Sequence, residues 1–335
     1  MAESHSGRNY CLDYVKGIAC IFVVFTHCRF PGTMGIIANC VARFSVPYFF
    51  MVSGYFSYYK DGRKFPAGRK IKHISIIVIA ATIFYILVGI AKILFLHSEF
   101  SVGFKDIVDF VLFNQMFFIS EHLWFLYALL YVYILYAAVD KLKLQKIAYF
   151  SIPVLVIAGI VLNRGDYLIG ISVPRTLYRN FLIEGFPMFM LGHLIHKYQE
   201  KIVSKFTNIQ LILIISVSIL LCLAERFAFG RDFRYCISSF PQAAAIFVFA
   251  LKNGSMGSTR ALTKLGVKYS LFVYVLHPFV WHTLEQGYSK VGIAKNTAAL
   301  YLLPVLVVIV TIILSIIIDK VISLINNRRK GETNG

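Results

Sequence analysis

Long apolar segments recur along the whole chain, separated by short stretches rich in charged residues, glycine or proline. Because the hydrocarbon core of a bilayer is about 30 Å thick, a helix needs about 20 mostly apolar residues to cross it. The chain is 58% hydrophobic and 15% charged, whereas soluble domains average about 25% charged residues. We therefore predict an all-α polytopic membrane protein with about ten transmembrane helices, at residues 12–30, 36–59, 74–96, 121–139, 147–162, 179–196, 208–225, 236–251, 269–286 and 298–325.

Lysine and arginine concentrate in alternate gaps between these segments. Because positively charged loops stay on the cytoplasmic side of a membrane, we expect these gaps and both termini to be cytoplasmic. The net charge of +18 then follows from topology and from attraction to anionic lipid headgroups, and nucleic acid is not an expected partner. The basic residues of these gaps are Lys60, Arg63, Lys64, Arg69, Lys70, Lys72, Lys141, Lys143, Lys146, Lys197, Lys201, Lys205, Lys252, Arg260, Lys264, Lys268, Arg328, Arg329 and Lys330.

No polar linker is long enough to separate two domains, so we predict a single membrane domain over residues 1–335, with its core at 10–326 and no appended extracytoplasmic domain. The first apolar segment bears Asp13 and Lys16 and lacks a small-residue cleavage pattern, so we expect it to remain as a helix. Residues 104–119 are apolar but short and acid-flanked, which favours an interfacial or re-entrant segment on the outer face. The six cysteines form no CxxC pair, so neither a disulfide framework nor a metal site is implied.

Three ionisable residues share one face of the first apolar segment. His27 follows Lys16 by eleven positions, and at 100° per residue this spacing is three turns plus roughly 20°, or about 16 Å along a helix. Asp13 precedes Lys16 by three positions and lies close to the same stripe. Each ionisable group within a membrane costs about 2.5 to 3.5 kcal/mol or more, so a function or a partner must offset that cost.

His27 is the leading catalytic candidate of this stripe. The ordinary pKa of imidazole lies near neutrality, so the ring can act as a general base or as an acyl acceptor. The residues alone leave another interpretation open, in which Asp13 and Lys16 pair at the membrane surface and His27 only forms a hydrogen bond to a neighbouring helix. We expect Asp13 to orient Lys16 rather than to transfer protons.

Glu184 is a second costly carboxylate, in the outer half of the segment at 179–196. We predict that it orients His27 or binds hydroxyl groups of an acceptor. The alternative is an ion pair with Arg175 or Arg179, which lie just outside the segment.

Two other polar sites within apolar segments are better explained by packing. His277 lies in mid-segment before Pro278, where backbone carbonyls freed by proline need partners, so we favour a structural role for it. Ser53 and Gly54 predict a close approach or a kink, since small residues let transmembrane backbones come together.

Trp124 and His122 fall where an outer aromatic belt is expected, so we interpret them as interface anchors or as residues that stack on a sugar. Arginines also occur on the outer side, against the inside bias of the other basic residues. We predict that they bind an anionic glycan or a lipid diphosphate. These arginines are Arg175, Arg179, Arg226, Arg231 and Arg234.

Residues 13–27 resemble the opening signature of the membrane acyltransferase-3 family, which reads Asp13-x-x-Lys16-Gly17-Ile18-Ala19 in this chain and continues to His27. The resemblance covers essentially the whole chain, and in it Lys16 takes the position usually held by arginine and His27 that of the essential histidine. Four more stretches, each similar to a family motif, follow in the usual order: PYFFMVSGYF at 47–56, HLWFL at 122–126, FMLG at 189–192 and YVLHP at 274–278.

One departure from the family pattern concerns residues 127–131. They read Tyr-Ala-Leu-Leu-Tyr where many members have an acidic pair and an aromatic residue. This puts an acidic role at that position in doubt and is similar to the shorter subgroup that lacks an extracytoplasmic catalytic domain. We therefore expect transfer to the final acceptor to finish within the membrane part.

The resemblance implies an acyltransferase that takes its group, usually acetyl, from cytoplasmic acetyl-CoA, with no metal required. Lysine and arginine are natural phosphate partners, so Lys16 and the basic loop at 60–72 would hold the nucleotide end of CoA. The other explanation for that loop is topology alone. The residues of this expected CoA site are Lys16, Arg69, Lys70 and Lys72.

The expected reaction is O-acetylation of a surface polysaccharide (O-antigen, capsule or exopolysaccharide) or its lipid-linked precursor, at the cytoplasmic (inner) membrane of a bacterium. The predicted catalytic residues are His27, Lys16, Asp13 and Glu184. The predicted acceptor-binding residues are Trp124, His122, Arg175 and Arg179. The rival function is a transporter or flippase of a small molecule or lipid-linked sugar, in which the four catalytic candidates would form a coupling path.

Overall fold

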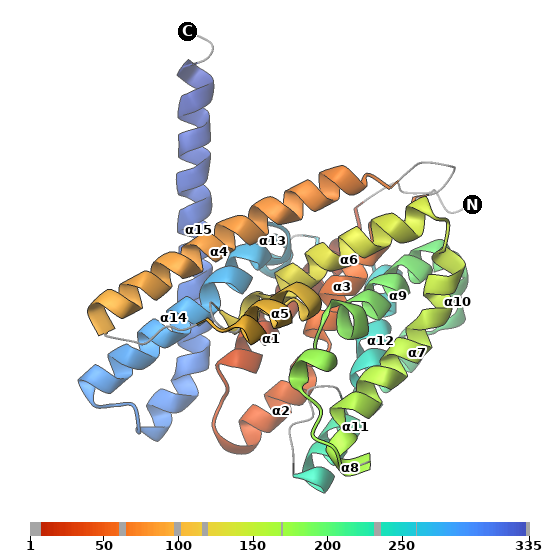
Figure 1. Ribbon diagram of the computed structural model, residues 1–335, viewed down its shortest axis with the longest axis horizontal. Coiled ribbons are helices and arrows are strands. Elements are labelled where there is room, and N and C mark those ends of the chain that lie inside the picture. The colour runs from red at the N-terminus through yellow and green to blue at the C-terminus, as the bar shows by residue number, and fades with distance from the viewer. Residues whose placement is uncertain are drawn as a thin grey trace. The chain divides into compact units, whose positions relative to one another are not determined.

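The structure, a computed structural model, describes residues 8–59, 65–96, 102–115, 120–168, 170–230, 236–258 and 260–332 (Figure 1). Every regular element within these ranges is helical, which confirms the predicted all-α fold. The chain divides into two compact units. We call Met1–Ser45 together with Phe249–Gly335 the terminal unit, and Val46–Val248 the central unit.

The terminal unit is organised around its first helix, α1, which contacts every other helix of the unit named here. The sequence sets the start of α1, because the Asn9 side chain accepts a hydrogen bond from Leu12 N at 2.9 Å and so caps the helix. Gly292 ends α14 in the left-handed conformation that glycine tolerates. The elements are α1 (Tyr10–His27), α2 (Gly32–Ala42), α13 (Ala261–Lys264), the π-helical turn η4 (Leu265–Tyr269), α14 (Ser270–Val291) and α15 (Thr297–Glu332).

The central unit contains the remaining helices. The side chains of Thr207 and Gln210 cap each other's backbone N–H groups where α11 begins, and Gly230 in the left-handed conformation ends it. The elements are α3 (Ser45–Tyr55), α4 (Ala67–Leu96), α5 (Phe104–Phe113), η1 (Glu121–Leu123), α6 (Trp124–Lys141), α7 (Gln145–Asn163), α8 (Gly165–Leu168), η2 (Arg175–Leu177), the π-helical turn η3 (Phe181–Gly185), α9 (Phe186–Lys197), α10 (Gln199–Lys205), α11 (Asn208–Phe229) and most of α12 (Ser239–Lys252).

Among the described residues, seven segments are long and apolar enough to cross a membrane. Each coincides with one of the ten predicted spans, which confirms a polytopic membrane protein. The other three predicted spans are also helical: η3 with α9, the shorter α12, and α14. Ten spans and cytoplasmic termini remain predictions. The seven segments are Tyr10–His27, Gly32–Tyr55, Ala67–Phe95, Glu121–Lys141, Gln145–Asn163, Asn208–Phe229 and Thr297–Asn327.

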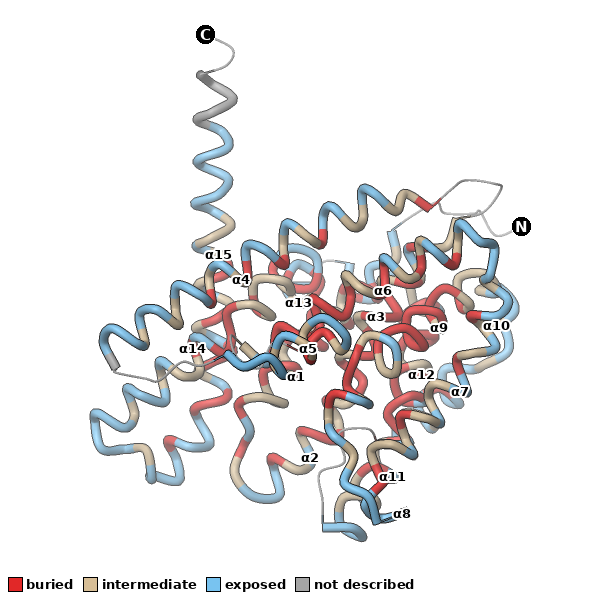
Figure 2. The backbone as a smooth tube through the Cα atoms, in the orientation of Figure 1, coloured by how far each residue is buried: buried red, intermediate tan, exposed pale blue. Residues whose placement is uncertain are grey.

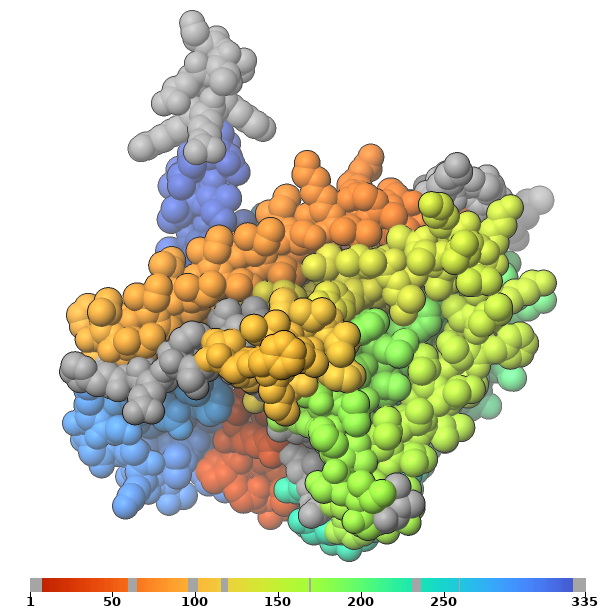
Figure 3. Space-filling view, in the orientation of Figure 1, coloured from red at the N-terminus to blue at the C-terminus, as the bar shows by residue number. Residues whose placement is uncertain are grey.

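Burial separates core helices from lipid-facing helices within the central unit. In the segment that contains α6, 67% of the residues of its 18-residue apolar stretch are buried, whereas the corresponding shares are 22% for α4, 11% for α7 and 17% for α11. Exposed residues recur along α4 and α7 (Figure 2), and both helices lie at the surface over most of their length in the space-filling view (Figure 3). Exposed apolar side chains such as Ile79 and Ile157 suit contact with lipid tails, which replace a protein neighbour.

Small residues bring α3 and α9 into backbone contact, as Gly54 predicts. A Cβ atom at Gly54 would collide with the carbonyl oxygen of Phe189, and one at Gly192 would collide with that of Met51. These contacts fix the position of the C-terminal half of α9, on which His193 and Lys197 lie.

Candidate functional site

The beginning of α1 carries a compact cluster of charges. Asp13 is 9% exposed, and its two carboxylate oxygens contact Lys16 Nζ and Arg8 Nη2, each at 2.7 Å. Arg8 Nε donates a second hydrogen bond to the same carboxylate at 2.8 Å. Two cations therefore compensate one buried anion, and its position in the first turn of a helix is also favourable for a carboxylate.

Glycine on both sides holds this turn of α1 against η4. A Cβ atom at Gly17 would collide with the carbonyl oxygen of Leu262, and one at Gly266 would collide with the carbonyl oxygen of Asp13. The Lys-Gly step of the sequence thus has a physical reason, because glycine after Lys16 lets the backbones touch beside the ion pair.

The other end of α1 carries His27, which is half-buried and is the last residue of the helix. Its ring lies against the ring of His277 on α14, with a distance of 5.0 Å between ring centroids and an angle of 53° between ring planes. Lys16 and His27 lie on one unbroken helix, as predicted, with the charge cluster and the imidazole pair at opposite ends of it.

His277 is fully buried, and its Nδ1 lies 3.0 Å from the carbonyl oxygen of Val273. A carbonyl only accepts hydrogen bonds, so Nδ1 carries the proton of the neutral ring and Nε2 keeps the lone pair. The carbonyl that Pro278 leaves without a helical donor is that of Tyr274, one residue after Val273, so the structural role expected for His277 beside Pro278 stays a prediction. The contact with His27 adds a role that sequence reasoning missed, although the YVLHP motif at 274–278 had marked the position.

In the central unit, two predicted acceptor-binding residues, Arg175 and Arg179, meet at the carboxylate of Glu121, and a third, Trp124, contacts one of them. Arg179 Nη1 lies 2.7 Å from Glu121 Oε1, and Arg175 contacts the same oxygen. The guanidinium of Arg179 also lies 4.6 Å from the centre of the Trp124 ring, a cation–π contact. Trp124 is 4% exposed, so little of its ring is open to a sugar, and its role as an interface anchor stays a prediction.

The fourth predicted acceptor residue, His122, is buried, and it lies beside different groups. Its Nδ1 is 2.7 Å from Ser120 Oγ, and its ring centroid is 4.8 Å from that of Tyr85. Of the other outer arginines, Arg226 lies on α11, and Arg231 and Arg234 lie outside the described residues.

Glu184 lies on the π-helical turn η3, a distortion that is frequent at functional sites. The Asn180 side chain caps this turn by accepting hydrogen bonds from Leu182 N and Ile183 N at 3.0 and 2.9 Å. Asn114 Oδ1 accepts a third from Phe181 N at 2.7 Å. Glu184 belongs to the central unit and His27 to the terminal unit, so a role in orienting His27 remains a prediction.

The basic residues expected in a loop lie instead on a helix. The predicted span begins at residue 74, but α4 begins at Ala67, so Arg69, Lys70 and Lys72 occupy its first turns. Lysine and arginine lose little rotamer freedom in a helix and are therefore good helix formers, so the helix extends through the basic stretch. Arg69 and Lys72 are exposed and available to an anionic ligand or to lipid headgroups.

A family model described as an acyltransferase domain matches residues 9–320. The match begins at the residue that caps α1 and extends into α15, so it covers residues of both units and every site residue predicted from the sequence. No curated protein and no solved structure matches the chain. The family match, nearly as long as the chain, agrees with the ordered motifs and with the membrane helices. The chain belongs to the acyltransferase-3 family of membrane acyltransferases.

Proposed function

We propose that this acyltransferase moves acetyl from cytoplasmic acetyl-CoA to a hydroxyl group of a cell-surface polysaccharide, or of its lipid-linked precursor, in the cytoplasmic membrane of a bacterium. One observation carries the proposal. His27 packs against the buried His277, and His27 lies on the same helix as the Asp13–Lys16 ion pair. An imidazole at one end of a helix and a cation three turns away suit a long donor with an anionic head and a thioester tip.

His27 acts as the general base. It removes the proton from the acceptor hydroxyl, whose oxygen attacks the thioester carbonyl. The C–O bond of the ester forms as the C–S bond breaks, and the proton on the imidazole passes to the CoA thiolate, so that His27 returns to its neutral form. The C-terminal end of α1 favours the transient imidazolium because partial negative charge collects there. A transiently acylated His27 would give the same products, and trapping labelled acetyl on the protein before acceptor is added separates the two routes.

Lys16, Arg69, Lys70 and Lys72 bind phosphates of the donor in this proposal. Arg175 and the half-exposed Glu121 contact polar groups of the acceptor, because the side chain of Glu121 is 45% exposed beside two arginines. Glu184 contributes a carboxylate for the acceptor hydroxyls.

Exchanging the two charges of the ion pair separates its structural role from donor binding. Lys16→Gln is expected to lower the amount of folded protein and to raise the KM for acetyl-CoA about tenfold, as for loss of one charge-assisted contact. Asp13→Lys combined with Lys16→Asp and Arg8→Glu reverses every charge of the cluster and keeps its attractions, so the protein level should recover while the KM stays high. Kinetics on membranes with matched protein content test this. Recovery of both quantities would show that Lys16 serves the ion pair alone.

His277 is expected to position His27. His277→Ala should lower kcat on the order of ten- to a hundredfold, because a small misplacement of a catalytic group is costly, with little change in the KM for acetyl-CoA. His277→Asn retains a donor for the Val273 carbonyl and should recover part of kcat. A purely structural role would instead lower the protein level in proportion to activity, with kcat per folded molecule unchanged.

Thiol release distinguishes acyl transfer from the rival transport function. Membrane vesicles containing the protein receive labelled acetyl-CoA, with or without envelope glycan. An acyltransferase releases free CoA thiol in step with label bound to glycan, and both depend on the acceptor. A transporter would move its cargo or label without releasing thiol, which would contradict the proposal.

A further inference from the structure

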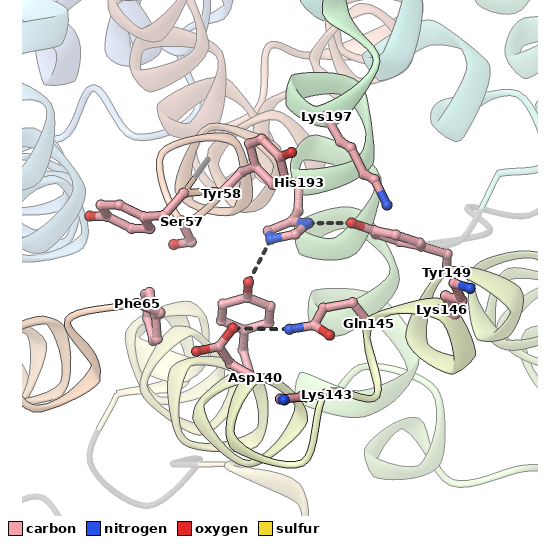
Figure 4. A pocket seen from close by; sticks show the side chains of 12 residues that line it. Ser57, Tyr58, Phe65, Asp140, Lys143, Gln145, Lys146, Tyr149, His193 and Lys197 are labelled. Carbon is pink, nitrogen blue, oxygen red and sulfur yellow. Dashed lines mark hydrogen bonds between the residues drawn. The ribbon is translucent and has the colours of Figure 1, made fainter. Parts of the chain in front are cut away.

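A pocket of about 440 Å³ lies within the central unit, among the ends of α3, α6, α7 and α9 (Figure 4). Its walls come from residues 57–59 after α3 and Phe65 before α4, from the ends of α6 and α7 with the turn between them, and from the last turns of α9. The volume falls within the range of about 300 to 1,000 Å³ that small-molecule sites occupy. None of the residues discussed so far as catalytic or acceptor-binding lines it.

The charges that line the pocket favour an anionic ligand. Three lysines, Lys143, Lys146 and Lys197, face one carboxylate, that of Asp140. The carboxylate already accepts a hydrogen bond from Gln145 Nε2 at 3.0 Å. An excess of ammonium groups around a defined cavity is the chemistry that binds phosphate.

Aromatic rings form much of the remaining wall. Phe65 and Tyr136 meet edge to face with 4.9 Å between ring centroids, and Tyr58 lies 5.1 Å from the ring of His193. Lys197 Nζ lies 5.3 Å from the centre of the Tyr149 ring. Aromatic faces bind flat heterocycles by stacking, so rings and ammonium groups together suit a ligand that joins a base to phosphates.

A hydrogen-bond chain fixes this wall. His193 is 3% exposed, and its Nε2 lies 2.5 Å from the Tyr136 hydroxyl while its Nδ1 lies 2.8 Å from the Tyr149 hydroxyl. Figure 4 shows the hydrogen bond between His193 and Tyr149 as a dashed line. A neutral imidazole donates through one nitrogen and accepts through the other, so both contacts are satisfied without a net charge. The wall is therefore preorganised and leaves the positive charge to the lysines.

The pocket lies on the side of the central unit that the basic connections mark as cytoplasmic. Lys143 and Lys146 belong to the second basic gap of the sequence, and Lys197 to the third. Phe65, which lines the pocket, directly precedes the first turns of α4 with Arg69 and Lys70. The residues that follow Phe65 along the chain therefore supply further cations for a phosphorylated cytoplasmic ligand.

We propose that this pocket binds the phosphorylated adenosine end of the acyl-CoA donor. The inference rests on the proposed function, because it is that function which makes acyl-CoA the cytoplasmic ligand. Adenine stacks on the tyrosine and phenylalanine rings, and the 3′-phosphate contacts the ammonium groups of Lys143, Lys146 and Lys197. The diphosphate is left to the cations that the proposed function assigns to it.

The test measures binding of labelled adenosine 3′,5′-bisphosphate to the full-length protein in nanodiscs of phosphatidylcholine. Wild type should bind it, and excess CoA should displace it while pantetheine should not. Lys143→Gln with Lys146→Gln should raise the Kd at least tenfold, and both positions are exposed, so folding is not at risk. The matched control is Lys201→Gln with Lys205→Gln, two exposed lysines of α10 that do not line the pocket. The control should bind like wild type.

Equal binding by both double variants would overturn the assignment, and so would absence of binding by wild type. If phosphatidylglycerol added to the nanodiscs displaced the labelled bisphosphate while CoA did not, the pocket would be a lipid-headgroup site. That result would also overturn the assignment. Acetyl transfer measured on the same samples keeps the two proposals distinguishable. Transfer with an unchanged KM for acetyl-CoA in the pocket variant would refute the pocket alone, whereas pocket-dependent binding of the bisphosphate without any acetyl transfer would refute the proposed function.

Discussion

Gly17→Ala is expected to destabilise the terminal unit by about 3 kcal/mol, the upper end of the usual cost of overpacking. The added Cβ atom would collide with the backbone carbonyl of Leu262, which has no rotamer by which to move away. Relief requires separating α1 from α13 and η4, and this would disturb the Asp13–Lys16 pair as well. Thermal unfolding of the purified protein in detergent measures the effect.

Gly287→Ala on α14 is the matched control. A Cβ atom there meets nothing within 4 Å, so alanine should be neutral or should stabilise the helix by up to about 1 kcal/mol. The two substitutions are chemically identical, yet their expected effects have opposite signs. Equal unfolding temperatures for the two variants would mean that α1 does not touch the backbone of α13 and η4.

His27→Ala is expected to lower the rate of acyl transfer about 10²- to 10⁴-fold, the usual contribution of a general base. The protein level should be unchanged, because His27 is half-buried at the end of its helix and leaves no large cavity. The rate of acetyl transfer per folded molecule, measured with saturating donor and acceptor, gives the ratio.

His282→Ala provides the histidine control for this variant. His282 lies on α14 in the same unit, and its side chain is 44% exposed. Its removal should leave the rate within a factor of about two, since surface substitutions usually have small effects. Equal losses in the two variants would remove His27 from its assigned role.

The part of the site that sequence predicts best is the part that lies on one helix. The Lys16 and His27 positions follow from the period of an α-helix, and α1 is continuous from Tyr10 to His27, as this argument requires. The apolar lengths likewise locate the helices, because the thickness of a bilayer imposes them. The apolar run does not specify a helix boundary where charge and helix propensity disagree, and α4 extends through basic residues that lie outside the apolar run.

The periodicity of the sequence does not predict which residues of distant segments contact each other. The packing of His277 on His27 joins α14 to α1, and no local pattern specifies which residues of two helices face each other. Arg175 and Arg179 both contact Glu121, which a separate turn brings to them, and no local pattern in the sequence specifies that contact.

The nucleotide pocket illustrates the same limit. Its tyrosines and lysines come from the ends of several helices and the residues that follow them, and the basic residues of each stretch alone indicate only topology. One signal in the sequence was available. Tyr58 and Tyr149 occur next to basic residues on the same predicted side, together with His193 and Lys197. Only the folded central unit brings these side chains around one cavity.

The most direct test of the central claim is transfer of labelled acetyl from acetyl-CoA into envelope glycan by membranes that carry the protein. Wild-type membranes should incorporate the label as a base-labile ester, and membranes with His27→Ala at matched protein level should not. Equal incorporation by the two would contradict the account of His27, and no incorporation by wild type with any envelope glycan would contradict the proposed acetyl transfer itself.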